Sequence, residues 1–136
     1  MKNVEPYLVF NGNCGEAFRF YETVFGVEPK MMRYRDIPDK NNVPEADMDR
    51  VVHVLLPVSK AVAIMGSDAP SAMDMTIGNN ISLTLNTESA EEAARLFEKL
   101  SAGGKVFMPL GRTFFAELYT MFEDRFGIQC MIMDHS

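Results

Sequence analysis

Two stretches of this chain resemble each other, and together they decide the fold. NCGEAFRFYE at residues 13–22 aligns with SAEEAARLFE at residues 89–98 at a constant offset of 76 residues. The two copies share Glu, Ala, Arg and Glu at matching positions. An internal repeat of this kind indicates a fold that is built from two related units.

Each copy carries the signals that begin a helix. Asn13 and Ser89 are good N-cap residues, and each is followed three positions later by a glutamate, Glu16 or Glu92. This spacing predicts a capping box at both helix starts. Apolar residues then recur at helical spacing: Ala17, Phe20, Tyr21 and Val24 in the first copy, and Ala93, Leu96, Phe97 and Leu100 in the second.

Extended segments flank both helices, which end at Gly26 and at Gly103-Gly104. Alternating or apolar runs bounded by turn residues predict the strands: residues 6–10, 30–34, 50–56 and 60–65 in the first half, and 80–85, 105–108, 116–122 and 128–133 in the second. The fold class predicted is α+β, with two tandem βαβββ units. The last strands of the two halves align best at an offset of 68.

The irregular segments fix the expected domain organisation. We expect a single domain of residues 1–136, with unit one at about 4–66, a linker at about 67–79 and unit two at about 80–134. Residues 36–49, which hold two Pro and five acidic residues without periodicity, are typical of a mobile surface loop. This loop and the linker either fold over a ligand or partner, or are merely solvated.

Charge and composition exclude several classes of function. Thirteen Lys and Arg against nineteen Asp and Glu give a formal net charge of -6, which disfavours nucleic acid as a partner. No apolar run reaches the roughly 18 residues of a membrane span, so we expect no membrane partner and a cytoplasmic protein. Cys14 and Cys130 have no metal-site spacing and are expected to be reduced and structural.

Several phrases, in order, identify a family. They are PYLVFNGN at 6–13, FYETVFG at 20–26, IMGSDAP at 64–70, MPL at 108–110, TFF at 113–115 and DRFGI at 124–128. Over residues 4–133 the chain resembles the PhnB-like branch of the vicinal oxygen chelate superfamily, the glyoxalase, bleomycin-resistance and dioxygenase group. The resemblance implies two curved sheets that form an incomplete barrel around a cavity, and commonly a homodimer.

The resemblance also implies where a metal would bind. Metal-dependent relatives use ligands on the first and last strand of each unit, which here fall near Pro6, Asn80, Ile64 or Met65, and Met131. None of these is a histidine or a carboxylate, the ligands that such an ion needs. We therefore expect no glyoxalase-type metal site, while a divalent metal elsewhere stays open and the cofactor stays unknown.

Two residues are candidates for catalysis. His53 aligns with Met121 at the offset of 68, and the resemblance places a histidine of this strand toward the cavity. Histidine changes charge near neutral pH, so His53 is a candidate general base, or else a histidine that is hydrogen-bonded on a sheet face. Glu117 follows TFFA at 113–116, where relatives tend to have Thr-Phe-Trp-Gly. It either pairs with His53 or is a surface carboxylate.

The ligand-binding residues are predicted from their chemistry. Polar side chains can orient a ligand, aromatic rings can stack on it, and flexible thioethers can line an adaptable pocket. The predicted set is Tyr7, Met65, Ser67, Phe114, Phe115, Met121 and Gln129. Most of the eleven methionines are expected in the core or pocket wall, and a copper site would require sulfurs that converge.

Three functions follow from these observations. The first is a protein of unproven activity that binds a small molecule in the barrel cavity. The alternative is a metal-dependent lyase, isomerase or dioxygenase with a relocated site at His53 and Glu117. A methyltransferase, a label that PhnB-like sequences sometimes carry, is disfavoured because no Gly-rich strand-to-helix turn is followed by an acidic ribose-binding residue.

Overall fold

The computed structural model describes residues 1–135 and divides into two compact units, with the boundary between Thr76 and Ile77. Unit 1 contains β1 (Tyr7–Phe10), α1 (Cys14–Phe25), β2 (Lys30–Arg33), β3 (Val51–Pro57) and β4 (Ala63–Asp68). Its open sheet has the strand order β1-β4-β3-β2, in which only the β1–β4 pair is parallel. Two short 3-10 helices, Tyr34–Asp36 and Glu45–Asp47, lie between β2 and β3.

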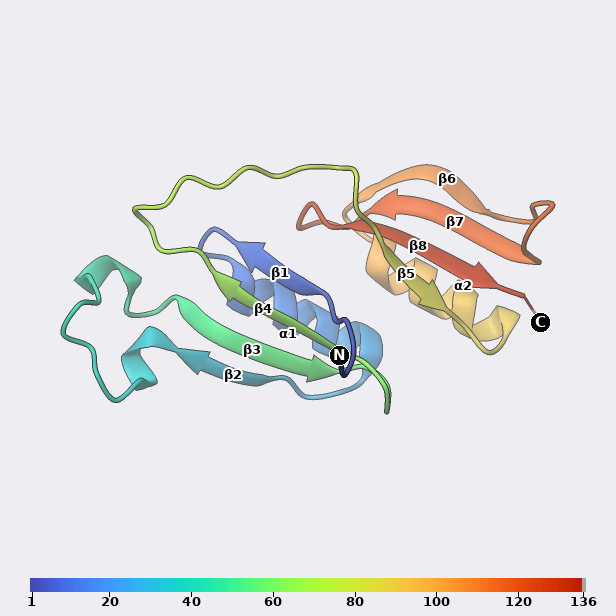
Figure 1. The fold of residues 1–136 in the computed structure, drawn as a ribbon. Helices are drawn as coiled ribbons and strands as arrows, with labels where there is room; N and C mark the ends of the chain where they lie inside the picture. The colour runs from blue at the N-terminus through green and yellow to red at the C-terminus, as the bar shows by residue number, and fades with distance from the viewer. Residues whose placement is uncertain (136) are drawn as a thin grey trace. The chain divides into compact units, whose positions relative to one another are not determined.

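Unit 2 repeats this topology. It contains β5 (Leu83–Asn86), α2 (Ala90–Ser101), β6 (Lys105–Gly111), β7 (Leu118–Glu123) and β8 (Gln129–Asp134), with the order β5-β8-β7-β6. In each unit the helix lies against one face of the sheet and leaves the other face uncovered (Figure 1). The predicted α+β class and the two tandem βαβββ units are therefore confirmed. Among the described residues, no helix is both long enough and apolar enough to cross a bilayer.

In unit 1 the core lies between α1 and the sheet. Phe18 is fully buried and packs edge to face against Phe10, with 6.2 Å between the ring centroids. A Cβ at Gly66 would lie 2.7 Å from the Phe18 ring and 2.7 Å from the Leu8 carbonyl oxygen. Gly66 thus lets the helix approach β4 closely, and any larger residue there would force α1 away from the sheet.

The two helices begin differently, which corrects one prediction. At α2 the Ser89 hydroxyl accepts a hydrogen bond from the Glu92 amide at 3.1 Å, although the Glu92 carboxylate accepts from the Glu88 amide instead of completing the box with Ser89. At α1 the Asn13 side chain makes no capping bond. Asp68 takes its place, because its carboxylate accepts from the Cys14 amide.

The segment at 36–49 is also more ordered than the sequence suggests. Asp47 is only 3% exposed and accepts a hydrogen bond from the Ser71 amide. Arg50, 3.5 Å from Asp47, donates to the Ala69 carbonyl and to the Asn11 side chain. The second half of the expected surface loop is therefore tied to the rest of unit 1 by a buried carboxylate.

Most predicted strands agree with the structure to within two or three residues, but the alignment of the halves changes. β4 and β8 have the same length and both end in a buried aspartate, Asp68 and Asp134, which are 66 residues apart. The predicted offset of 68 between the last strands of the two halves was therefore wrong by two residues. A shift of two residues leaves each side chain on the same face of the sheet but aligns it with a different residue of the other half. His53 corresponds in this alignment to Tyr119 and not to Met121.

Candidate functional site

The uncovered face of the first sheet gathers four of the predicted site residues. Tyr7 on β1 and Leu55 on β3 are both register partners of Met65 on β4, so the three side chains share one face. His53 lies two residues before Leu55 on the same face, opposite Met32 of β2. Ser67 follows Met65 on this face. Tyr7 and Met32 are 45% and 48% exposed, respectively, so the face is open to a ligand.

Tyr7 and His53 form the polar centre of this face. The Tyr7 hydroxyl lies 3.5 Å from His53 Nδ1, and the two rings are tilted with 5.9 Å between their centroids. This is the outer limit of a hydrogen bond. Both groups remain accessible from the same side, so the oxygen and the imidazole can both contact a polar group of a bound molecule.

The first and last strands of each unit, where the resemblance implied a metal, lie side by side in both sheets. On the open faces, the neighbouring first- and last-strand residues are Tyr7 with Met65 in unit 1 and Thr84 with Met131 in unit 2. Asn80, near which the first-strand position of unit 2 was expected, precedes β5, as Pro6 precedes β1. Among the described residues, no group of three His, Cys, Asp or Glu side chains is arranged to hold a metal ion.

Thioethers and one tyrosine occupy the open face of the second sheet. Met121 of β7 is the register partner of both Met108 on β6 and Met131 on β8. The Tyr119 hydroxyl donates to the Met131 sulfur at 3.4 Å. Gln129, predicted as a ligand contact, donates its amide to the Glu123 carboxylate at 2.8 Å. A ligand would have to compete with that bond.

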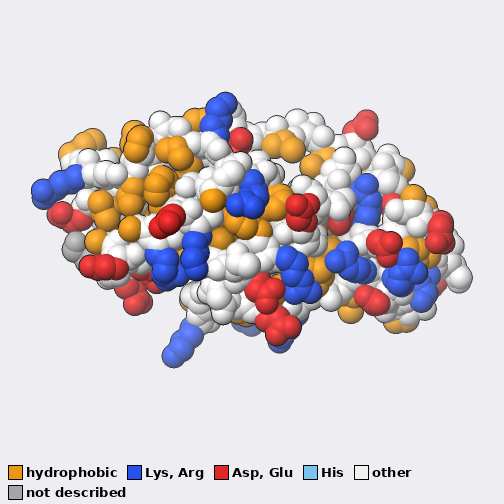
Figure 2. Space-filling model, turned by 180° about the vertical axis from the view of Figure 1, so that it is seen from behind, with side chains coloured by type: hydrophobic (Ala, Val, Ile, Leu, Met, Phe, Trp, Pro, Cys, Tyr) orange, Lys and Arg blue, Asp and Glu red, His pale blue; other side chains and the backbone are white. Residues whose placement is uncertain are grey.

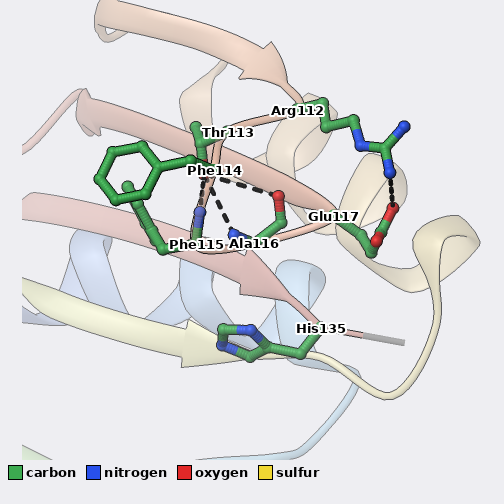
Figure 3. Close-up of a pocket in the computed structure, with 7 residues that line it drawn as sticks. All are labelled: Arg112, Thr113, Phe114, Phe115, Ala116, Glu117 and His135. Carbon is green, nitrogen blue, oxygen red and sulfur yellow. Dashed lines mark hydrogen bonds and ion pairs between the residues drawn. The ribbon is translucent and has the colours of Figure 1, made fainter.

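A separate pocket lies within unit 2 at the loop between β6 and β7 (Figure 3). It has a volume of about 420 Å³ and is lined by Arg112, Thr113, Phe114, Phe115, Ala116, Glu117 and His135. Phe114 at the loop tip is 100% exposed. Glu117 forms an exposed ion pair with Arg112 at 3.5 Å, and Figure 3 shows both side chains on the same side of the loop.

The Thr113 side chain shapes this loop. Its hydroxyl accepts from the amides of Phe115 and Ala116, and its own amide donates to the Ala116 carbonyl. This closes a tight turn that projects the Phe114 ring outward. Phe115 packs instead toward Tyr119, with 5.0 Å between the ring centroids.

The predicted site residues are thus distributed over both units. Tyr7, His53, Met65 and Ser67 lie on one face in unit 1, whereas Phe114, Phe115, Glu117, Met121 and Gln129 belong to unit 2. The proposed pairing of His53 with Glu117 crosses the two units and stays a prediction.

Sequence reasoning missed two residues of the second unit. Arg112 was missed because its partner Glu117 lies five positions away, a spacing that no helix or strand period suggests. Tyr119 was missed because the offset of 68 aligned the wrong residue with His53.

Comparison with known proteins places the chain in a family. The model for the Glyoxalase/Bleomycin resistance protein/Dioxygenase superfamily matches residues 3–132. Protein PA1353 from Pseudomonas aeruginosa is 40% identical in its crystal structure, with a TM-score of 0.88 and coverage of 98% of this chain and 97% of that one. YjdN from Escherichia coli K12 is 28% identical over 95% of this chain and 92% of its own length.

A more distant solved structure has the same fold. It is the Bacillus cereus PhnB protein, described as a putative 3-demethylubiquinone-9 3-methyltransferase, which is 22% identical with a TM-score of 0.76 and covers 97% of this chain and 98% of its own. With two βαβββ units and a family match over nearly its whole length, this chain belongs to the glyoxalase/bleomycin resistance/dioxygenase superfamily, and it has PhnB-like neighbours.

Proposed function

We propose that this protein binds a small, mainly apolar or aromatic molecule that carries one polar group, and that the binding surface is the open face of the first sheet. The observation that carries the proposal is the Tyr7–His53 pair, 3.5 Å apart on that face. Apart from Ser67, the residues around the pair are apolar: Val9, Met32, Leu55 and Met65.

This composition suits a ligand site. Ligand pockets are mostly apolar, with a few polar groups that orient the bound molecule. Val9 and Tyr7 are 46% and 45% exposed, respectively, so apolar surface is available for burial. A hydroxyl or carbonyl of the ligand would lie between the tyrosine oxygen and the imidazole, and the hydrocarbon part would cover the neighbouring methionine and leucine.

The proposal extends to the second unit. The predicted contacts Met121 and Gln129, and the loop residues Phe114, Phe115 and Glu117, are proposed as additional ligand contacts. Their support is chemical: the loop pocket combines two exposed aromatic rings with an ion pair. The organisation of residues 1–136 as a single domain made of two units is proposed as well.

We also propose that the protein is a homodimer, as members of this superfamily commonly are. β6 is an edge strand whose consecutive residues Val106 and Phe107 are 43% and 49% exposed. Figure 2 shows hydrophobic side chains gathered on the part of this view that unit 2 occupies. An apolar edge strand of this kind favours association.

We also propose that the protein is located in the cytoplasm.

The binding proposal is tested by a thermal-shift and calorimetry screen with phenols and aromatic ketones. A compound that stabilises the wild type should bind about 10-fold more weakly to Tyr7→Phe and to His53→Phe, because each loses one hydrogen bond of about 1.5 kcal/mol. Tyr34→Phe, outside this face in a 3-10 helix, is the matched control and should bind like wild type. Equal affinity in all three variants would refute the proposed orientation by Tyr7 and His53.

The second candidate is a metal-dependent lyase, isomerase or dioxygenase with His53 and Glu117 as its relocated site. Family membership favours it, whereas the Arg112–Glu117 ion pair opposes it because a bound metal would need the carboxylate free. Elemental analysis after purification without chelator separates the two functions. A stoichiometric divalent metal that disappears in His53→Ala would favour the enzyme.

A further inference from the structure

We propose that the open face of the second sheet binds a soft monovalent metal ion, Cu(I) or its analogue Ag(I), through the thioethers of Met108, Met121 and Met131. This site lies apart from the Tyr7–His53 pair, which is on the first sheet, although Met121 is also among the additional ligand contacts proposed above. It requires neither a histidine nor a carboxylate.

The register of three adjacent strands carries the inference. Met121 in β7 is the direct partner of Met108 on one side and of Met131 on the other. Side chains of directly opposed residues share a face, with Cβ atoms roughly 4.5–5.5 Å apart. The three methionines therefore lie next to one another across the sheet: the Met121–Met131 pair is in regular register, and Met108 faces Met121 where β6 shifts register on both sides. Their unbranched side chains can turn their sulfurs toward the central one.

The row is accessible and lies on the side of the sheet away from α2. Met108 is 43% exposed, and neither Met121 nor Met131 is buried. The residues that alternate with them, Thr120, Cys130 and Ile132, are buried on the helix face. Folding against α2 therefore leaves the thioethers uncovered.

The chemistry of the donors selects the ion. A thioether is neutral and soft, so it favours Cu(I) over hard divalent ions. The Tyr119 hydroxyl donates to the Met131 sulfur at 3.4 Å and holds this thioether in place. Thr84 Oγ1 approaches the same sulfur at 4.0 Å. Met131 is thus already positioned by its neighbours before any ion binds.

Thiols are the competing ligands, and they lie elsewhere. Cys130 is next to Met131 in sequence but is 1% exposed on the opposite face of the sheet. Its burial keeps the thiol out of solvent and away from the row of methionines. A metal bound to thiols would be insensitive to substitution of Met121.

The test uses silver nitrate in a chloride-free buffer with the full-length protein, followed by native mass spectrometry and titration. We expect one Ag(I) per chain in the wild type and at least a 10-fold loss of affinity in Met121→Leu, a substitution that conserves volume. Met133→Leu, on the same face but outside the row, and Met73→Leu, in the exposed segment after β4, are matched controls and should bind like wild type.

Three results would overturn the proposal: no retained ion, equal binding in Met121→Leu and wild type, or equal losses in all three leucine variants. Circular dichroism of each variant verifies folding, and Met108→Leu replaces Met121→Leu if the latter fails to fold. The outcome does not depend on the small-molecule screen, since Tyr7→Phe should bind Ag(I) like wild type.

Discussion

At the scale of single residues, Asp68 illustrates how one buried carboxylate organises a unit. Its Oδ1 accepts from the amides of Gly12 and Cys14 at 2.8 and 3.0 Å, and its Oδ2 accepts from the Val51 amide at 2.9 Å. It therefore joins the end of β4 to the start of α1 and to β3. A carboxylate with three backbone donors is a structural group, and its chemistry is unavailable for a ligand.

Replacing this carboxylate should be strongly destabilising. Asp68→Ala leaves three backbone amides without an acceptor, at roughly 1–3 kcal/mol each, so urea unfolding should show a loss of about 3 kcal/mol or more. Asp49→Ala is the matched control, because that carboxylate is 82% exposed in its pair with Arg35. Such pairs contribute about 0–1 kcal/mol. Similar losses in the two variants would contradict this role of Asp68.

The burial of Cys14 makes the stability of the protein depend on pH. Desolvation, and after it the charge of Asp68, raises the pKa of its thiol to about 12 from 9.0. Since the unfolded chain ionises this thiol at the lower pKa, the contribution of Cys14 to stability is complete below pH 9 and is lost as the pH rises toward about 12.

We therefore expect the free energy of unfolding to fall between pH 9 and 11, and to fall less steeply in Cys14→Ala. Urea titrations of both proteins across this range measure the difference. Parallel pH profiles would mean that the thiol titrates alike in the folded and unfolded chain.

At the scale of elements, the two helices show that similar sequences can be capped in different ways. Ser89 accepts from the Glu92 amide, whereas Asn13 at the matching position makes no capping bond and Asp68 serves α1 from a distant strand. The repeat therefore conserves the helix but not the residue that begins it.

This difference gives a matched pair of variants. Ser89→Ala should lower the free energy of unfolding by about 1 kcal/mol through loss of an N-cap. Asn13→Ala should change it by less than about 0.5 kcal/mol, because no capping bond is lost. Thermal or urea unfolding measures both changes. An equal loss of free energy of unfolding at the two positions would show that the Ser89 capping bond does not stabilise the protein.

At the scale of the whole molecule, association is the expected property. The chain has a mass of 15.3 kDa. We expect light scattering after size exclusion to give twice this value, because the consecutive apolar residues of β6 would gain by being covered. Phe107→Glu should shift the mass toward the monomer, while Phe114→Glu, outside any strand, serves as a comparison. A monomeric mass for the wild type would refute the homodimer.

The repeat and the periodicity determined the elements, because helix and strand signals are local. Apolar spacing and the glycine at residue 26 placed α1, and alternation placed β3 and β7 to within two residues. The family phrases then led to the superfamily that the comparisons confirm. The face of Met65 was predictable in the same way, since alternation along a strand fixes which residues share a side.

Only the tertiary structure decided the cross-strand relations, because strand register depends on contacts between distant segments. It brought Tyr7 to within 3.5 Å of His53, made Tyr119 and not Met121 the counterpart of that histidine, and aligned Met108, Met121 and Met131 in one row. It also replaced the expected cap of Asn13 with Asp68. The sequence by itself therefore determined the two units and their family. The pairing between strands determined which side chains meet, because a two-residue shift in register changes every cross-strand partner and leaves the alternation of apolar and polar residues unchanged.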